Sequence, residues 1–121
     1  MGGLHMRFVA WGILGLLCLA GPAGADDDQS INAVIKFAQK DGTWKELVLG
    51  AGSGLAAANA VLGQRGQPRL FCPPDTMSIT ADQYVSFLAS YVKEHPQAGT
   101  GRDSFYSLVL LYAMKEVFPC K

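Results

Sequence analysis

The sequence is poor in the side chains from which enzyme and metal sites are usually built. It contains two histidines and three cysteines, with no Cys-x-x-Cys pair. A zinc site needs three or four ligands, and a catalytic site needs a nucleophile with a base, a carboxylate pair or a metal. After residue 25 the only imidazole is His95, which precedes a proline at the end of an apolar segment, as a helix cap would. We therefore expect no catalytic residue, no metal and no cofactor, and we favour a binding protein over an enzyme.

The sequence also lacks an excess of either charge. Ten Lys and Arg balance ten Asp and Glu, and the residues after position 25 carry nine against ten. A protein that binds nucleic acid or a membrane surface normally presents a clear basic excess. The composition therefore argues against both kinds of partner.

The first 25 residues have the pattern of a secretory signal peptide. Arg7 supplies a weakly positive start, an uncharged apolar run follows over residues 8–21, and Ala23-Gly24-Ala25 offers small residues for cleavage. The run is shorter than the ~20 apolar residues that span a membrane, so an uncleaved anchor is the less favoured alternative. We expect residues 1–25 to be removed and residues 26–121 to form one periplasmic domain.

Cleavage at that point leaves two cysteines, Cys72 and Cys120. An even number of cysteines in an exported chain favours a disulfide, because the compartment is oxidising. A metal site is the competing interpretation, but the chain offers too few ligands for it. We predict a Cys72–Cys120 disulfide, which should stabilise the fold by roughly 4 kcal/mol on the chain-entropy model.

Apolar residues recur at helical spacing, and no segment shows the alternation typical of a strand. A first helix is predicted from Ile31 until Asp41-Gly42. A second begins at a capping box with Thr43 as N-cap and Glu46 at the third helical position, and it ends near residue 62 or 63. It contains three glycines, of which Gly50 and Gly54 are expected to admit another helix closely or to mark a kink.

Two further helices lie between the cysteines. The third begins at a capping box from Thr80 to Gln83 and ends at His95-Pro96, because a residue before proline disfavours the helical region. A glycine-rich loop, residues 97–101, leads to a last helix over 104–117, capped by Thr100 or Asp103. The pattern predicts an all-α domain, a small bundle of four helices stapled by one disulfide.

The last helix is apolar nearly all round, which is typical of a helix that is central or shared with a partner. One apolar face runs from Phe105 to Tyr112. The residues off that face lack an obvious neighbour in so small a domain, and we expect them to form a homodimer interface. They are Leu110, Leu111 and Met114.

Several short motifs follow one another between the cysteines: Phe71-Cys72-x-Pro74, Ile79-Thr80-x-x-Gln83, Val85-x-x-x-Ala89-x-Tyr91-x-x-x-His95-Pro96 and Phe118-Pro119-Cys120. This order resembles the Rap/Tai family of immunity proteins, which are small exported helical proteins associated with bacterial type VI secretion. The resemblance implies a disulfide-bonded, often dimeric, all-α fold. It also implies a role, namely to bind and neutralise a cell-wall-degrading effector, typically a peptidoglycan amidase, in the periplasm.

Loops rather than helix faces are expected to block the effector's active site. Glycines allow backbone to approach a cleft closely, so we favour the loop that carries Gln97, Thr100, Arg102 and Asp103. The other long loop carries Arg65, Gln67 and Arg69. Arginine on a rigid scaffold suits recognition, because little ordering entropy is lost on binding.

Two other functions remain open at this point. One is a small periplasmic acid-stress chaperone, for which ten acidic residues and one histidine after residue 25 offer a weak acid switch. The other is an accessory subunit of an envelope complex.

Overall fold

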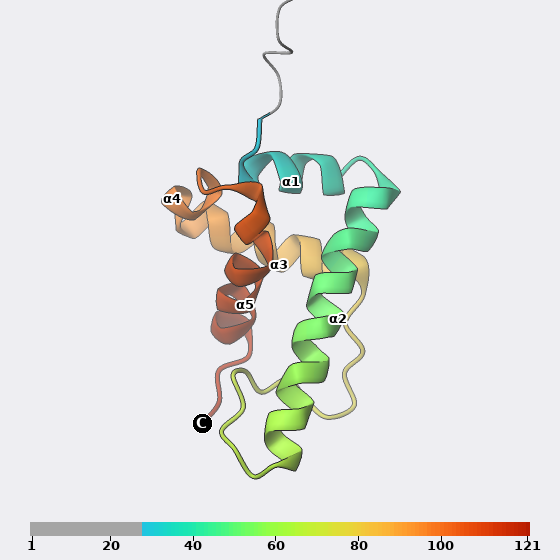
Figure 1. The fold of residues 1–121 in the computed structure, drawn as a ribbon, viewed down its shortest axis with the longest axis vertical. Helices are drawn as coiled ribbons and strands as arrows, with labels where there is room; N and C mark the ends of the chain where they lie inside the picture. Colours follow the sequence, from blue (N-terminus) through green and yellow to red (C-terminus); the bar gives the residue numbers. More distant parts are fainter. Residues whose placement is uncertain (1–27) are drawn as a thin grey trace, which may run out of the picture.

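The computed structural model describes residues 28–121, so the predicted signal peptide lies outside the described residues. Within that range all regular structure is helical and there is no strand, which confirms the predicted all-α fold. The elements are α1 (Ile31–Ala38), α2 (Gly42–Gln64), α3 (Ala81–Glu94), α4 (Pro96–Gly99), the 3₁₀ turn η1 (Asp103–Phe105) and α5 (Tyr106–Val117) (Figure 1).

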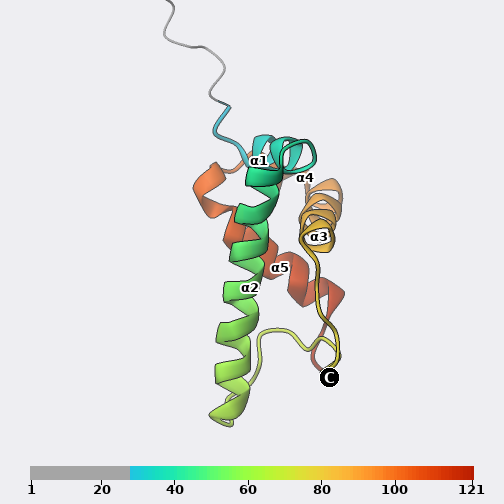
Figure 2. The ribbon, with the colours of Figure 1, turned by 90° about the vertical axis from the view of Figure 1, so that its right-hand side faces the viewer.

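The helices are arranged around the long α2. Figure 1 shows α1 across one end of the molecule, α2 running away from it along the long axis, and α5 beside α2 with α3 behind. From the side, α5 crosses obliquely behind α2 towards α3 (Figure 2). The core lies where α1, α2, α3 and α5 meet, and its largest fully buried side chains are Phe71, Ile31, Leu88, Leu110, Met114 and Val48.

Three helices, α1, α2 and α3, begin at a side-chain cap, whereas α5 begins without one. Thr80 and Gln83 form the predicted capping box of α3, with hydrogen bonds in both directions. At α2 the predicted cap is wrong, because the helix begins two residues earlier than a Thr43 cap implies. Asp41 is the N-cap, and its Oδ1 accepts a hydrogen bond from the Thr43 N–H at 2.7 Å.

One glycine of α2 permits the close approach of α3, but it is neither of the two that we expected. A Cβ at Gly52 would overlap the ring of Tyr84, whereas Gly50 and Gly54 have open space where a Cβ would stand. Gly52 therefore lets the Tyr84 ring pack against the backbone of α2. Burial in this position raises the pKa of Tyr84 above its ordinary value.

The face of α5 that packs into the core is not centred where predicted, since its buried residues are Val109, Leu110, Ala113 and Met114. Leu110 and Met114 are fully buried within a single chain, so their assignment to a dimer interface is wrong. The large apolar side chains that stay exposed on this helix and its approach include Phe105, Leu108 and Tyr112, each about half exposed. Leu111 lies at the border and packs partly against the core. A helix that is apolar on every side does not reveal its buried face, and here the crossings with α2 and α3 decide it.

In the described part of the chain, α2 is the one helix long and apolar enough to span a membrane by length and composition. Long apolar helices of folded domains meet the same criterion.

Candidate binding surface at the disulfide

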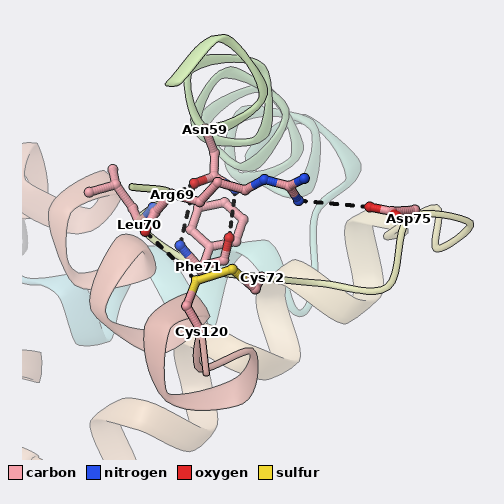
Figure 3. The surroundings of a disulfide bond; sticks show 7 residues. All are labelled: Asn59, Arg69, Leu70, Phe71, Cys72, Asp75 and Cys120. Carbon is pink, nitrogen blue, oxygen red and sulfur yellow. Dashed lines mark hydrogen bonds and ion pairs between the residues drawn. A yellow bond between two sulfur atoms is a disulfide. The ribbon is translucent and has the colours of Figure 1, made fainter. Parts of the chain in front are cut away.

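The disulfide joins loop 65–80 to the end of the chain. Cys72 and Cys120 are bonded with their Cα atoms 5.0 Å apart, across 48 residues of sequence, as predicted. The Cys72 N–H also donates to the Phe118 carbonyl at 2.8 Å. The middle of a long loop and the segment after α5 are therefore held side by side (Figure 3).

A second anchor of the loop is Asn59, a buried polar side chain of α2. Its Nδ2 donates to the Phe71 carbonyl at 2.7 Å, and its Oδ1 accepts from the N–H groups of Leu70 at 2.7 Å and Phe71 at 3.3 Å. Figure 3 shows the amide between α2 and the loop. Because Phe71 itself is fully buried, the loop is fixed immediately before its cysteine. Sequence reasoning missed this residue, and its only signal was an asparagine in register with the apolar face of α2.

Around these anchors the surface is hollowed by two adjoining depressions of about 580 and 680 Å³. Arg69, Pro73, Pro74 and Asp75 line both of them. We call this region the disulfide surface. The remaining residues of its two depressions are Ala56, Asn59, Ala60, Gly63, Gln64, Pro68, Phe71, Cys72, Met77, Cys120 and Lys121.

Arginine and lysine side chains remain available on this surface. Arg69 Nη1 lies 3.7 Å from Asp75 Oδ1, and the Asp75 side chain is 90% exposed. An exposed ion pair of this length contributes little to stability, so a carboxylate from a partner can replace Asp75 at small cost. Lys121 adds a second positive side chain at the rim. The geometry thus suits the binding of an acidic group on another protein.

The predicted insertion loop lies at the other end of the molecule, where its backbone is used by the fold (Figure 1). Gln97 belongs to α4, and its carbonyl accepts the Thr100 hydroxyl at 2.8 Å. Arg102 pairs with Ser30 in an isolated bridge, and the Asp103 N–H donates to the Gln29 carbonyl at 2.7 Å. The three side chains of Gln97, Thr100 and Arg102 are exposed, while that of Asp103 is half-buried.

The glycines of that loop serve internal packing. A Cβ at Gly99 would overlap Asn32 and Val92, so the absence of a side chain here lets α1 and α3 pack against the loop. The Gly101 carbonyl accepts the Ile31 N–H at 3.0 Å and thereby helps to start α1. These glycines allow the chain to approach itself closely, which removes the reason for preferring this loop as the inserted element.

Comparison of the chain with protein-family models, with curated proteins and with solved structures finds no match. The functional interpretation therefore depends on the motifs of the sequence and on the two surfaces described above.

Proposed function

We propose that this chain is a periplasmic immunity protein that binds a secreted peptidoglycan-degrading effector, typically an amidase, and blocks its active site. The proposal is supported by the order of the cysteine- and proline-containing motifs and by the disulfide that joins the first of them to the last. It is further supported by a surface whose polar groups are exposed while its backbone is fixed.

The observation that carries the proposal is that the disulfide surface combines a fixed backbone with exposed polar side chains. Loop 65–80 is tied down by the disulfide and by three hydrogen bonds to Asn59. Its side chains Arg69 and Asp75 nevertheless face solvent. A partner that binds here loses little conformational freedom in the loop, and a preorganised surface of this kind favours tight inhibition.

Of the two candidate surfaces, we assign the contact with the effector to the disulfide surface. It is hollowed and carries a replaceable ion pair, whereas the backbone of residues 97–103 is already engaged with α1 and α3. The two surfaces lie at opposite ends of the molecule (Figure 1). A single active-site cleft therefore contacts one of them, which makes the assignment testable.

The proposal predicts that a neighbouring gene encodes a peptidoglycan amidase, and the test is inhibition of that enzyme by this chain. Release of stem peptides from purified cell wall is measured with increasing amounts of the protein in its oxidised form. We expect Arg69→Ala to weaken inhibition by about tenfold or more, and the matched variant Arg102→Ala to leave it unchanged. If the unaltered protein does not inhibit, the proposed function is wrong; if Arg102→Ala alone weakens inhibition, the other loop makes the contact.

We also keep the homodimer as a prediction, now through the exposed face of α5. Leu108 and Tyr112 lie one turn apart on that face and are about half exposed. Light scattering at tens of micromolar should give the mass of two chains for the unaltered protein and of one chain for Leu108→Glu. A monomer in the first measurement would contradict the prediction.

A further inference from the structure

At the end of α3 the fold brings together one imidazole and two carboxylates that are not adjacent in sequence. His95 Nε2 lies 2.9 Å from Glu116 Oε1, and 21 residues separate the two along the chain. Glu94 completes the group, since one ligand atom from each of the three residues lies within 4.8 Å of the others. We propose that Glu94, His95 and Glu116 form a binding site for a divalent transition-metal ion, for which Zn²⁺ is the probe.

The charges around this group favour a cation. Glu94 is the last residue of α3, and Glu116 is in the last turn of α5. The C-terminus of a helix carries partial negative charge and disfavours acidic side chains, yet here two of them converge. Lys93 and Lys115 stand in the same last turns, yet within residues 28–121 the one ion pair of either carboxylate is that of Glu116 with His95. A bound cation would relieve this concentration of negative charge.

The ligand types indicate which cation fits. One imidazole nitrogen and two carboxylate oxygens suit Zn²⁺ and its neighbours, whereas Mg²⁺ and Ca²⁺ prefer oxygen ligands alone. Ligands at 2.0–2.2 Å from a tetrahedral ion lie roughly 3.3 Å apart. The three side chains are exposed, and their ligand atoms, which lie within 4.8 Å of one another, would have to move closer to bind the ion. Water completes the coordination.

Two features prepare His95 for this role. Its backbone is held by the N–H bond to the Tyr91 carbonyl at 2.8 Å. Its ring lies against the ring of Tyr91, with centroids 4.3 Å apart. The Nε2 atom is thereby directed towards Glu116. Without metal, Nε2 donates to the Glu116 carboxylate; when the metal binds, the ring carries its proton on Nδ1 and the Nε2 lone pair becomes the ligand.

A metal ion bound here would link the C-terminal ends of α3 and α5, which the disulfide does not join. A small groove of about 210 Å³ adjoins it, with Glu94, Glu116 and Tyr91 among its lining residues. This inference is independent of the proposed immunity function, because it depends on a different part of the surface.

The experiment is calorimetric titration of the oxidised protein with ZnCl₂ at pH 7.5, in a buffer that does not chelate zinc. We expect one strong site per chain. His95→Gln and Glu116→Gln should each weaken it by more than about tenfold, since even outer-shell changes cost 10–100-fold in known sites. The matched control Glu46→Gln, at an exposed glutamate of α2, should bind as the unaltered protein does.

Thermal unfolding supplies a second measurement that is sensitive to the folded state. Saturating Zn²⁺ should raise the Tm of the unaltered protein and leave that of His95→Gln unchanged. Because His95 is exposed, the variant is expected to fold, and its helical circular dichroism without metal verifies this. Zinc binding that survives His95→Gln would overturn the proposal, since it would place the ion at other residues. An equal Tm increase with Ca²⁺ would overturn it as well, because the imidazole would then not be a ligand.

Discussion

Asn59 offers the sharpest test of how loop 65–80 is held. Replacing it with alanine removes one amide that makes three hydrogen bonds, to Leu70 and Phe71. Each such bond contributes about 1 kcal/mol net, and leaving the buried Phe71 N–H and carbonyl without partners adds a penalty of about 1–3 kcal/mol. Water from the adjoining depression, which Asn59 lines, relieves part of that penalty. We expect Asn59→Ala to lower the free energy of unfolding by about 3 kcal/mol.

The assay is reversible urea unfolding followed by circular dichroism. For a domain of this size, 3 kcal/mol corresponds to a decrease in Tm of roughly 12–24 °C. The matched control is Asn32→Ala. This position is an exposed asparagine in the first turn of α1, where its side chain lies beside Gly99. The control should lose less than about 1 kcal/mol.

If the two alanine variants differ by less than about 1 kcal/mol, the amide does not anchor the loop and the reasoning is refuted. Should Asn59→Ala fail to fold, Asn59→Asp replaces it in the comparison. Aspartate keeps the oxygen that accepts from Leu70 and Phe71 but loses the donor to the Phe71 carbonyl. Its protonated form restores that donor, so the variant should recover stability as the pH falls towards 4.

The two anchors of the loop should also be coupled energetically. Cys72→Ser alone is expected to cost about 2–5 kcal/mol. Once the disulfide is lost, the loop is less ordered and Asn59 has less structure to hold. The double variant should therefore lose at least about 0.5 kcal/mol less than the two single losses together. Strict additivity would show that the anchors act independently.

Three further predictions concern the core. Gly52→Ala should destabilise the protein by about 1–3 kcal/mol, because the new Cβ overlaps a buried ring. Gly50→Ala should stabilise it by about 0.5–1 kcal/mol, because the Cβ there meets open space. Urea unfolding should show these opposite signs, and equal effects of the two substitutions would contradict the prediction. Leu110→Ala should lower the free energy of unfolding by about 2–5 kcal/mol and Leu108→Ala by less than about 1 kcal/mol, because only Leu110 is fully buried. The reverse order would show that the face predicted from the sequence is the buried one. Stability should fall as the pH rises above about 10, because burial raises the pKa of Tyr84 and the unfolded chain releases that proton first. Tyr84→Phe should weaken this pH dependence. An unchanged pH profile would show that Tyr84 does not contribute to it.

Much of the fold was determined locally and could be predicted from the sequence. The capping box of Thr80 and Gln83 and the proline after His95 mark the ends of α3 within a residue. Such signals depend on backbone chemistry over three or four positions. The disulfide followed from cysteine number and expected compartment, because two cysteines in an oxidising environment have only one possible pairing. The candidate site was predicted less well, since Arg69 was named only in the second-ranked loop.

Tertiary structure decided which side chains meet. The buried face of α5 depends on where α2 and α3 cross it. The sequence of a helix that is apolar on all sides does not indicate where those crossings lie. The same holds for Gly52, whose role is set by a tyrosine 32 residues away, and for Asn59, whose partners are loop backbone groups that any residue possesses. Glu94, His95 and Glu116 meet for the same reason, because two helix ends converge at a point that sequence spacing does not encode. Local patterns thus determined the ends of a helix such as α3, and the packing of the helices decided which side chains their surfaces present.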